Sequence, residues 1–416
     1  MAVGLYLARR EILRSNPWTT GLIVLVMMLT FFNMLLLGGI LIGLAQAAVG
    51  SYQQYFSGDV LILPAGTKTE ITRTVDIDTV ARSLPTFKNI SNRFGVPATL
   101  EYNWQRKIKP TDLSESASGV IVGIDPARED RATHLSGSLA AGSFLSATDA
   151  DEIVIGSNLI NKYATARGEA LALGGRILKT ADVGSRVRLT VNGVTREVTI
   201  KGVITTNNLL VDSRIYMVDR VLRQFTGNSD LNATEIAVYL TLGASPEAAK
   251  QYLLKNLGDT NDLTIDTATD ALPSSILTIF DTFNKLTDLV GGISLIVGAI
   301  TIFIIIFVNA ITRRKFIGIL KGIGISPRAI EISYVIQALF YSTTGIVISS
   351  ILIMGLIKPY FILHPLTFAI APTSLDIRWS DVVTRAMVLT LTSFVSGLIP
   401  AYLVTKQNTL DAILGR

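Results

Sequence analysis

Four long stretches of the chain contain no charged residue, and their uneven spacing limits the possible folds more than any other feature. The first covers residues 15–58, and the other three lie close together at 289–312, 332–357 and 386–405. A helix of about 20 apolar residues crosses the roughly 30 Å hydrocarbon core of a bilayer. We therefore predict one spanning helix, a large polar domain, and then three more spanning helices.

The balance of charge differs between the polar domain and the rest of the chain. Residues 50–285 hold 24 Lys and Arg against 26 Asp and Glu, whereas the remaining residues hold 13 against 6. The basic excess therefore belongs to the membrane part, where it sets orientation. Because no basic patch of the kind that nucleic acids need is present, we expect no nucleic-acid partner.

The sequence lacks the common catalytic motifs. No Gly-Lys dipeptide occurs, so there is no G-x-x-x-x-G-K-[ST] loop for ATP, and neither G-x-S-x-G nor H-E-x-x-H is found. There is no Cys, and His134 and His364 are far apart, so we expect no metal site. We interpret the isolated carboxylates of the polar domain as solvated surface groups. The chain is therefore predicted not to be an enzyme and to hold no cofactor of its own.

Basic residues beside the spans predict their orientation, since cytoplasmic loops are enriched in Lys and Arg. These residues are Arg9, Arg10 and Arg14 before the first span, Arg313, Arg314, Lys315, Lys321 and Arg328 after the second, and Lys406 and Arg416 after the fourth. We therefore place both termini and the loop after the second span in the cytoplasm, and the polar domain outside. The lipid membrane itself is the first expected partner.

The start of the chain has two possible interpretations. Leu5, Ala8 and Ile12 recur at helical spacing, which predicts an amphipathic helix on the inner membrane face, although a plain basic flank would also set the topology. The tripeptide 45–47 matches the A-x-A of a signal peptide, but the apolar run 18–48 is about twice the usual length. We expect an uncleaved span.

The polar domain shows mixed α/β patterns. Strand-like runs occur at 59–63, 119–124, 153–155 and 237–240, and the runs 187–190 and 198–204 flank Asn192-Gly193, a hairpin turn signal. Helices are predicted at Ser157–Ala166 and Ser245–Leu257. Residues 275–290 are amphipathic and continue into the second span, so they form either a stalk together with residues 47–57 or a helix packed on the domain.

The loop after the second span is predicted to form a short basic helix. Phe316, Ile317, Leu320 and Ile323 are available for an apolar face, and Gly322, Gly324 and Ser326-Pro327 break the helix. If this helix is exposed, we expect another surface to bury its apolar face. That surface belongs either to a partner protein or to the membrane.

These residues resemble the MacB/FtsX-type (type VII) permeases of ABC transporters, including the lipoprotein-releasing LolC/LolE branch. That family carries R-E-I-G-I-L-R-A-x-G-A-S in a coupling helix, and residues 315–326 here read K-F-I-G-I-L-K-G-I-G-I-S. Pro400-Ala401 with Thr409 to Leu414 resembles the family's C-terminal pattern, and residues 58–60, 122–125, 155–157 and 201–203 resemble its periplasmic core domain. Two positions depart from the pattern: Phe316 replaces an acid, and Gln337 stands where a Glu is usual.

The resemblance implies that the chain is a permease subunit that works with a separate cytoplasmic ABC ATPase. Two copies of this ATPase are expected per complex, and they bind ATP and Mg. A second permease copy or homologue completes the complex, and nucleotide-driven motion of the outer domain exports or extracts a substrate. The alternative is an FtsX-like regulator that activates an outer partner such as a cell-wall hydrolase. The residues expected to couple to the ATPase are Arg313, Arg314, Lys315, Phe316, Ile317, Gly318, Leu320, Lys321, Gly322 and Gly324.

Three small residues recur at four-residue spacing on the first span. Gly39, Gly43 and Ala47 form a small-xxx-small row of the kind that lets spanning helices pack closely. We predict that this face lies at a helix–helix contact, with the dimer axis as one candidate.

The fold class expected is an α-helical membrane domain of four spanning helices, with a mixed α/β extracytoplasmic domain between spans 1 and 2, in the cell membrane of a prokaryote. The predicted segments are a cytoplasmic amphipathic N-terminal helix 1–16, the first span 17–49, the extracytoplasmic domain 50–274, the stalk and second span 275–312, the coupling helix 313–326, the third span 327–358, an extracytoplasmic loop 359–382, the fourth span 383–405 and a cytoplasmic tail 406–416.

Overall fold

The computed structural model describes residues 2–14, 16–106, 115–164, 177–367 and 372–406. The predicted tail beyond Lys406, with the pattern from Thr409 to Leu414, lies outside these residues. Two compact units are present. The helical unit comprises Met1–Ala45, Thr278–Leu366 and Thr373–Arg416, and the α/β unit comprises Gln46–Leu277 and Thr367–Pro372.

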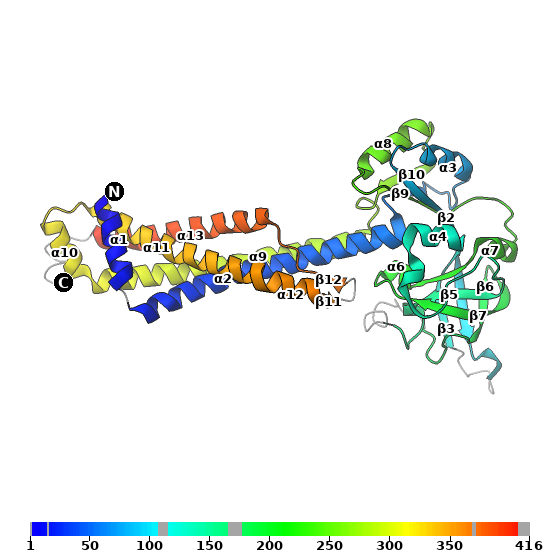
Figure 1. Cartoon of the computed structure of the whole chain (residues 1–416), viewed down its shortest axis with the longest axis horizontal. Coiled ribbons are helices and arrows are strands. Elements are labelled where there is room, and N and C mark those ends of the chain that lie inside the picture. The colour runs from blue at the N-terminus through cyan, green and yellow to red at the C-terminus, as the bar shows by residue number, and fades with distance from the viewer. Residues whose placement is uncertain (1, 15, 107–114, 165–176, 368–371, 407–416) are drawn as a thin grey trace. The chain divides into compact units, whose positions relative to one another are not determined.

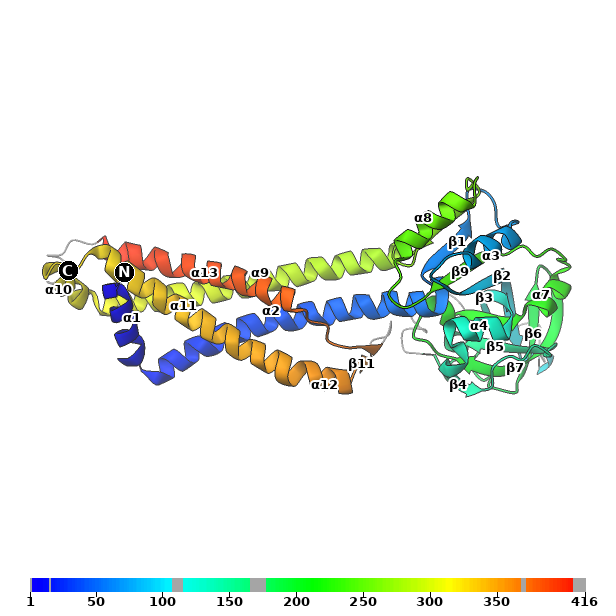
Figure 2. The same ribbon diagram turned by 45° about the horizontal axis from the view of Figure 1, so that its top comes forward.

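The helical unit contains the predicted spans (Figures 1 and 2). Its helices are α1 (Ala2–Arg14), α2 (Pro17–Tyr52), α9 (Ser274–Thr312), α10 (Arg314–Gly322), α11 (Pro327–Leu352), α12 (Lys358–Leu363) and α13 (Trp379–Thr405). The helical stretches Pro17–Ser57, Ile276–Thr312, Pro327–Leu363 and Trp379–Thr405 are long and apolar enough to cross a membrane. The predicted fold class is confirmed as four candidate spanning helices, with an α/β domain between the first and the second of them along the chain.

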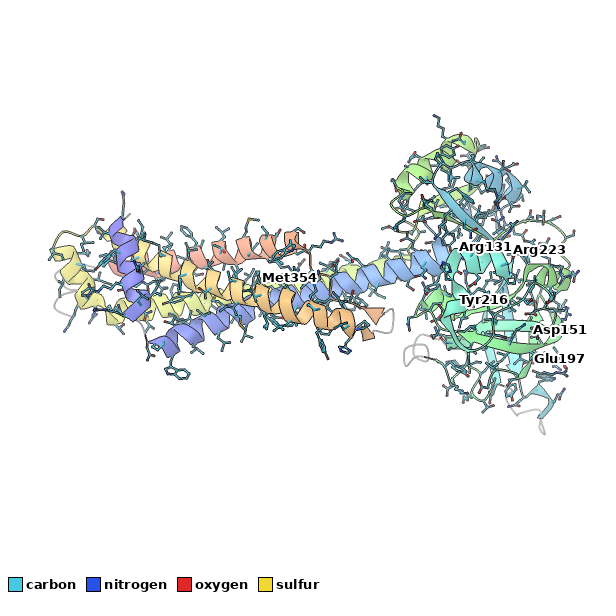
Figure 3. The ribbon with its side chains drawn as sticks, in the orientation of Figure 1. Arg131, Asp151, Glu197, Tyr216, Arg223 and Met354 are labelled. Atoms are coloured by element: carbon cyan, nitrogen blue, oxygen red, sulfur yellow. The ribbon has the colours of Figure 1, made fainter. Side chains whose placement is uncertain are left out.

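The third and fourth apolar helices extend beyond the spans predicted for them. A π-helical turn, η5 (Ile353–Ile357), which carries Met354 (Figure 3), joins α11 to α12 without a break, so the third apolar helix reaches Leu363 rather than 358. Pro359 directly follows the π-helical turn inside this continuous helix, where its missing N–H removes one backbone hydrogen bond. Likewise, α13 begins at Trp379 rather than 383, and Asp381 accepts the backbone N–H of Arg378 at its start.

Apolar side chains hold the helical unit together. Met27, Phe31 and Leu35 of α2 pack with Ile306 of α9 and Leu389 of α13 in one buried cluster. Many other apolar side chains of the same helices are exposed, as expected for surfaces that face lipid.

The α/β unit is built on one mixed sheet. Its strands are β1 (Val60–Pro64), β2 (Phe87–Tyr102), β3 (Glu115–Ile124), β4 (Leu139–Gly142), β5 (Glu152–Gly156), β6 (Arg186–Val191), β7 (Val194–Ile204), β8 (Arg214–Val218), β9 (Glu235–Leu240) and β10 (Leu263–Thr267). The strand order is β10-β1-β9-β2-β3-β8-β5-β7-β4, with β6 paired to β2 and β7. The helices are α3 (Thr74–Arg82), α4 (Pro126–Thr133), α6 (Leu209–Asp212), α7 (Asp219–Thr226) and α8 (Pro246–Asn256).

Strand β2 belongs to two lobes of this unit. Residues Phe87 to Arg93 pair with β9, and residues Phe94 to Tyr102 pair with β3. The small lobe, formed by β1, β9, β10, α3, α8 and the first half of β2, has a core that includes Ile62, Ile77, Ile90, Ile236 and Leu253. The large lobe is formed by the remaining strands, the second half of β2, and α4, α6 and α7. Its core includes Leu100, Ile121, Ile155, Leu189 and Ile215.

Local sequence signals predicted several of these elements. Strands β6 and β7 pair from Val191–Val194 outward, and Asn192 and Gly193 have φ angles of 49° and 81°, as the predicted hairpin turn requires. The Oγ of Ser245 accepts the N–H of Ala248 at the start of α8.

The helix predicted at Ser157–Ala166 is wrong over its described part. A single 3₁₀ turn covers Ser157–Leu159, and Ile160 then forms a parallel bridge with Leu178. Because Leu159, Ile160 and Leu178 are buried in the large-lobe core, pairing with distant residues prevails over the local helical pattern.

Candidate functional site

Helix α10 is the short element between two of the candidate spanning helices, α9 and α11. It begins after Arg313 and ends where Gly324 adopts a φ of 94°, a conformation that favours glycine. Ile317 is 3% exposed and Gly318 is also buried, so this side of α10 packs into the helical unit. The predicted coupling segment therefore folds as a separate helix with one face turned inward.

The opposite side of α10 is apolar and open. Phe316, Ile319 and Ile323 are 44%, 51% and 71% exposed, and their i, i+3 and i+7 spacing puts them on one face. The predicted face of Phe316, Ile317, Leu320 and Ile323 is therefore wrong in part, because Ile317 and Leu320 pack against the core of the helical unit. Lys315 and Gly322 are exposed, and Arg314 and Lys321 are half-buried.

Polar contacts attach both ends of α10 to other helices. At its start, Nη1 of Arg313 lies 3.0 Å from Oε1 of Glu11 in α1, and Nε2 of Gln337 in α11 donates to the other oxygen of Glu11 at 2.7 Å. At its end, Nζ of Lys321 donates to the carbonyl of Thr405 in α13 at 3.0 Å. The hydroxyl of Thr405 donates in turn to Glu331 in α11 at 2.7 Å. A displacement of α10 would therefore act on three helices.

The small-residue row on α2 has a different neighbour from the one predicted. A Cβ on Gly43 would lie 2.0 Å from the carbonyl oxygen of Ser374, and one on Gly39 would lie 2.4 Å from the side chain of Ile377. The carbonyl of Gly39 also accepts the N–H of Asp376 at 3.2 Å. Gly39 and Gly43 thus pack on an extended segment of the same chain rather than on another helix, which corrects the prediction for them. Ala47 is half-buried.

In the α/β unit, four charged residues meet where β2 passes from the small lobe to the large lobe. We call Arg93, Glu129, Arg214 and Glu235 the junction cluster. Arg93 is 1% exposed, and its Nη2 lies 2.6 Å from Glu129 Oε1 and its Nη1 lies 3.2 Å from Glu235 Oε1. Arg214 donates from both Nη atoms to the two oxygens of Glu235, at 2.6 and 2.8 Å. Each charge is therefore matched inside the protein.

Within the junction cluster, neighbouring charges keep Glu235 and Arg214 ionised. Burial by itself would raise the pKa of Glu235, but the charges of Arg214 and Arg93 and their hydrogen bonds lower that pKa to about 2. Burial would likewise lower the pKa of the Arg214 guanidinium, and Glu235 raises it above its usual value. Such a cluster is costly to disrupt, because removing one partner leaves another charge buried and unmatched.

The junction cluster also binds the residues that follow α2. Nη1 of Arg93 donates to the carbonyl of Phe56 at 2.6 Å, and the Arg214 guanidinium lies 4.3 Å from the centre of the Phe56 ring. The Tyr52 ring stacks on Phe56 at 4.9 Å, and its hydroxyl donates to the carbonyl of Ala271, just before α9, at 2.7 Å. The C-terminal end of α2 and the segment just before α9 are therefore joined to each other and to both lobes within the α/β unit.

Sequence reasoning missed this cluster. The carboxylates of the polar domain were expected to be solvated, yet Glu129 and Glu235 are buried. Glu235 lies 142 residues from Arg93 along the chain, so no local spacing marks the pair. No strand was predicted over Arg93 or Arg214, so no local signal marked either residue. Among the described residues, no group of three His, Asp or Glu could hold a metal ion.

The C-terminal part of the chain matches a known family. Residues 289–409, which include α10, match the family described as FtsX-like permease C-terminal. The chain is 24% identical over 213 residues to the ABC transporter permease YtrF of Bacillus subtilis, covering 49% of this chain and 48% of that protein. It is 27% identical over 172 residues to the uncharacterized ABC transporter permease MJ1507 of Methanocaldococcus jannaschii, covering 41% and 42%. The chain thus spans less than half the length of these two relatives.

Two solved structures are also similar. The periplasmic region of MacB from Actinobacillus actinomycetemcomitans has 13% identity and a TM-score of 0.33, covering 53% of this chain and 94% of that one. The extracellular domain of the noncanonic ABC-type transporter YknZ from Gram-positive bacteria has 14% identity and a TM-score of 0.33, covering 50% and 98%.

Proposed function

The chain carries an FtsX-like permease domain, and from this premise we propose that it is the permease subunit of an ABC transporter, with α10 as the contact for a separate ATPase. The observation that supports this most strongly is the construction of α10. Its apolar side, Phe316, Ile319 and Ile323, is open, while Arg313 and Lys321 fix its ends to the helices around it. A partner protein can displace a helix built in this way while the helix stays bonded to its neighbours.

The exposed apolar side chains of α10 determine the affinity that we expect for the ATPase. Burying one large apolar side chain completely contributes about 1.5–3 kcal/mol. Since Phe316, Ile319 and Ile323 are about half exposed or more, covering each would contribute roughly 1–2 kcal/mol. Lys315 is exposed beside them, so the matching surface on the ATPase is an apolar pocket with carboxylates at its edge.

In this proposal, α10 and both chain ends face the cytoplasm of a prokaryotic cell, and the α/β unit faces outward. Two ATPase subunits bind ATP and Mg and work with this chain and a second permease copy or homologue. Their motion displaces α10 together with α1, α11 and α13. Helices α2 and α9 continue into the α/β unit. There Tyr52 bonds to Ala271, just before α9, and Phe56 bonds to Arg93 of the junction cluster. The movement of the two lobes then exports or extracts a substrate at the outer face.

The test is co-expression of the full-length chain with the proteins encoded beside its gene, followed by purification, identification of any bound P-loop ATPase and measurement of ATP hydrolysis in nanodiscs. We expect the ATPase to co-purify with the wild-type chain and with Leu242→Asp, a fully exposed position in the α/β unit. Phe316→Asp should lower co-purification at least about tenfold, because it puts a charge into an apolar contact. Failure of any P-loop ATPase to bind the wild type, or equal binding by Phe316→Asp, would contradict the proposal.

A further inference from the structure

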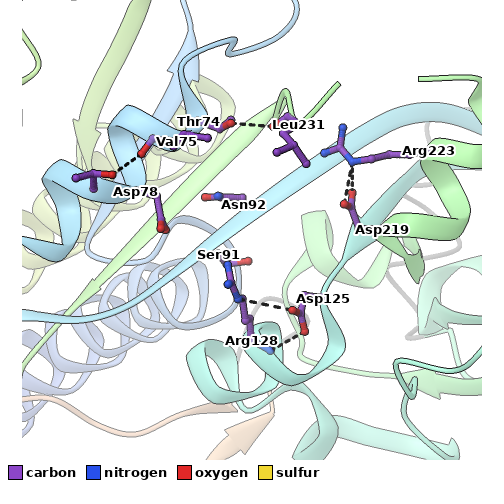
Figure 4. A pocket seen from close by; sticks show the side chains of 11 residues that line it. Thr74, Val75, Asp78, Ser91, Asn92, Asp125, Arg128, Asp219, Arg223 and Leu231 are labelled. Carbon is purple, nitrogen blue, oxygen red and sulfur yellow. Dashed lines mark hydrogen bonds and ion pairs between the residues drawn. The ribbon is translucent and has the colours of Figure 1, made fainter. Parts of the chain in front are cut away.

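A groove lies between the two lobes of the α/β unit, beside the junction cluster (Figure 4). Its volume is about 320 Å³, which is at the lower end of the range for small-molecule sites. Its walls come from α3 of the small lobe, from β2, from the starts of α4 and α7, and from the loop before β9. The lining residues are Thr74, Val75, Asp78, Thr79, Ser91, Asn92, Asp125, Arg128, Asp219, Arg223 and Leu231.

The hydroxyl groups of this groove act as acceptors toward a ligand. A Thr or Ser hydroxyl has one proton to donate. Thr74 gives that proton to the carbonyl of Leu231 and Thr79 gives it to the carbonyl of Val75, both at 2.8 Å. Ser91 gives its proton to Glu129 of the junction cluster. The lone pairs that these three oxygens retain can only accept hydrogen bonds from a bound molecule.

A carboxylate adds charged acceptors to the groove. Asp78 binds Arg82 of the next helical turn at 2.7 Å, and its two oxygens keep further lone pairs. Figure 4 shows Asp78, Asn92 and Ser91 around the same space.

Each guanidinium group at the groove is paired with a carboxylate at the start of its own helix. Arg223, on α7 (Figure 3), donates Nε to both oxygens of Asp219 and its Nη atoms to the carbonyls of Asp230 and Asn232. Nε of Arg128 lies 3.6 Å from Oδ2 of Asp125, which is an ion pair longer than a hydrogen bond. An anion would therefore compete with internal carboxylates, whereas a cation meets a surplus of oxygen acceptors.

We propose that this groove binds a primary ammonium group carried on a short aliphatic chain. An ammonium has three N–H donors and no acceptor, which matches a lining rich in acceptors. Val75 and Leu231 at the edge of the groove are 64% and 68% exposed, and they would cover the aliphatic part. The free form of this ligand is an alkylamine, and the peptide form is a lysine side chain. Binding would also connect α3 to β2 next to the junction cluster.

The test uses the full-length chain alone in detergent, so its outcome does not depend on any ATPase. Binding of n-butylammonium is measured at pH 7.5 by calorimetry and by hydrogen exchange, with 1-butanol and butyrate as matched probes. We expect saturable binding of butylammonium only, with slower exchange in residues 74–79 and 89–93. A capped peptide with one lysine, compared with its acetyl-lysine form, shows whether a peptide can also supply the ammonium.

One variant and one control assign the site. Asp78→Asn should weaken butylammonium binding at least about tenfold, since it removes a charged acceptor. Asp76→Asn, which changes the same residue type on α3 outside the groove, should leave binding unchanged. Equal binding of butanol, protection elsewhere in the chain, or equal losses in Asp76→Asn and Asp78→Asn would overturn the proposal.

Discussion

Replacing Glu235 by Ala tests whether the junction cluster holds the two lobes together. In the wild type, Glu235 accepts two hydrogen bonds from Arg214 and lies 3.2 Å from Arg93. Removing it leaves Arg214 buried against the Phe56 ring without a carboxylate, whereas Arg93 retains Glu129. Breaking a buried ion pair from one side costs about 3–5 kcal/mol.

Hydrogen exchange of the β9 amides in the full-length protein measures this loss in the α/β unit alone. A loss of about 4 kcal/mol corresponds to exchange roughly 10³-fold faster, at about 1.4 kcal/mol per tenfold. The control is Glu197→Ala, which removes an exposed carboxylate from β7 at the edge of the same unit (Figure 3) and should change stability by less than about 0.5 kcal/mol. Adding Arg214→Met to Glu235→Ala should recover at least about 1 kcal/mol, because no unmatched charge then remains at that pair.

The pH dependence of the same contact has a defined sign. The pKa of Glu235 is about 2 in the folded protein, below its usual value of 4.5, so its stabilisation is present above pH 4.5 and is lost as pH falls toward 2. The difference in unfolding free energy between the wild type and Glu235→Gln should therefore shrink by about 3 kcal/mol between pH 5 and pH 2.

An unchanged β9 exchange rate in Glu235→Ala, or an equal loss of stability in Glu197→Ala, would refute the idea that the junction cluster holds the two lobes together.

Two other changes have expected effects of known sign. Asp212, whose Oδ1 accepts two bonds from Thr206, is buried, and burial raises its pKa to about 6. Because that pKa lies above the usual 3.8, the stability of the fold falls as pH rises from 3.8 to about 6 and stays lowered above that range. Asp212→Asn should therefore stabilise the α/β unit by about 3 kcal/mol at pH 7.5 and by little at pH 4, measured by urea unfolding. Gly43→Ala should lower the melting temperature in detergent, because its Cβ would meet the Ser374 carbonyl, while Gly21→Ala on the same helix, which meets nothing, should be neutral or slightly stabilising. Equal melting temperatures for these two glycine variants would argue against the packing of Gly43 on that segment.

Features encoded in short segments were predictable from the sequence. The four charge-free stretches located the apolar helices, and Asn192-Gly193 located a hairpin, because both signals depend on neighbouring residues. The break at Gly324 likewise located the end of α10. These patterns require no knowledge of how distant segments pack.

Features that depend on tertiary packing were not predictable. Ile317 and Ile319 look equivalent in a short apolar helix, and only the position of α10 against its unit decides that Ile317 is buried and Ile319 exposed. The Gly39 and Gly43 row signals close packing but does not identify the neighbour, which is the extended segment at 373–377. Arg93 and Glu235 became recognisable as a pair only once β2 and β9 lay side by side.

In the proposed arrangement, α10 meets an ATPase in the cytoplasm while the α/β unit lies outside the cell. Because the chain has no Cys, single substitutions can report sidedness directly. We predict that, in intact cells, a membrane-impermeant maleimide labels Asn192→Cys in the exposed hairpin turn, and labels Phe316→Cys only after the membrane is opened. Labelling of Phe316→Cys from outside intact cells would contradict the account, since α10 could then contact no cytoplasmic ATPase.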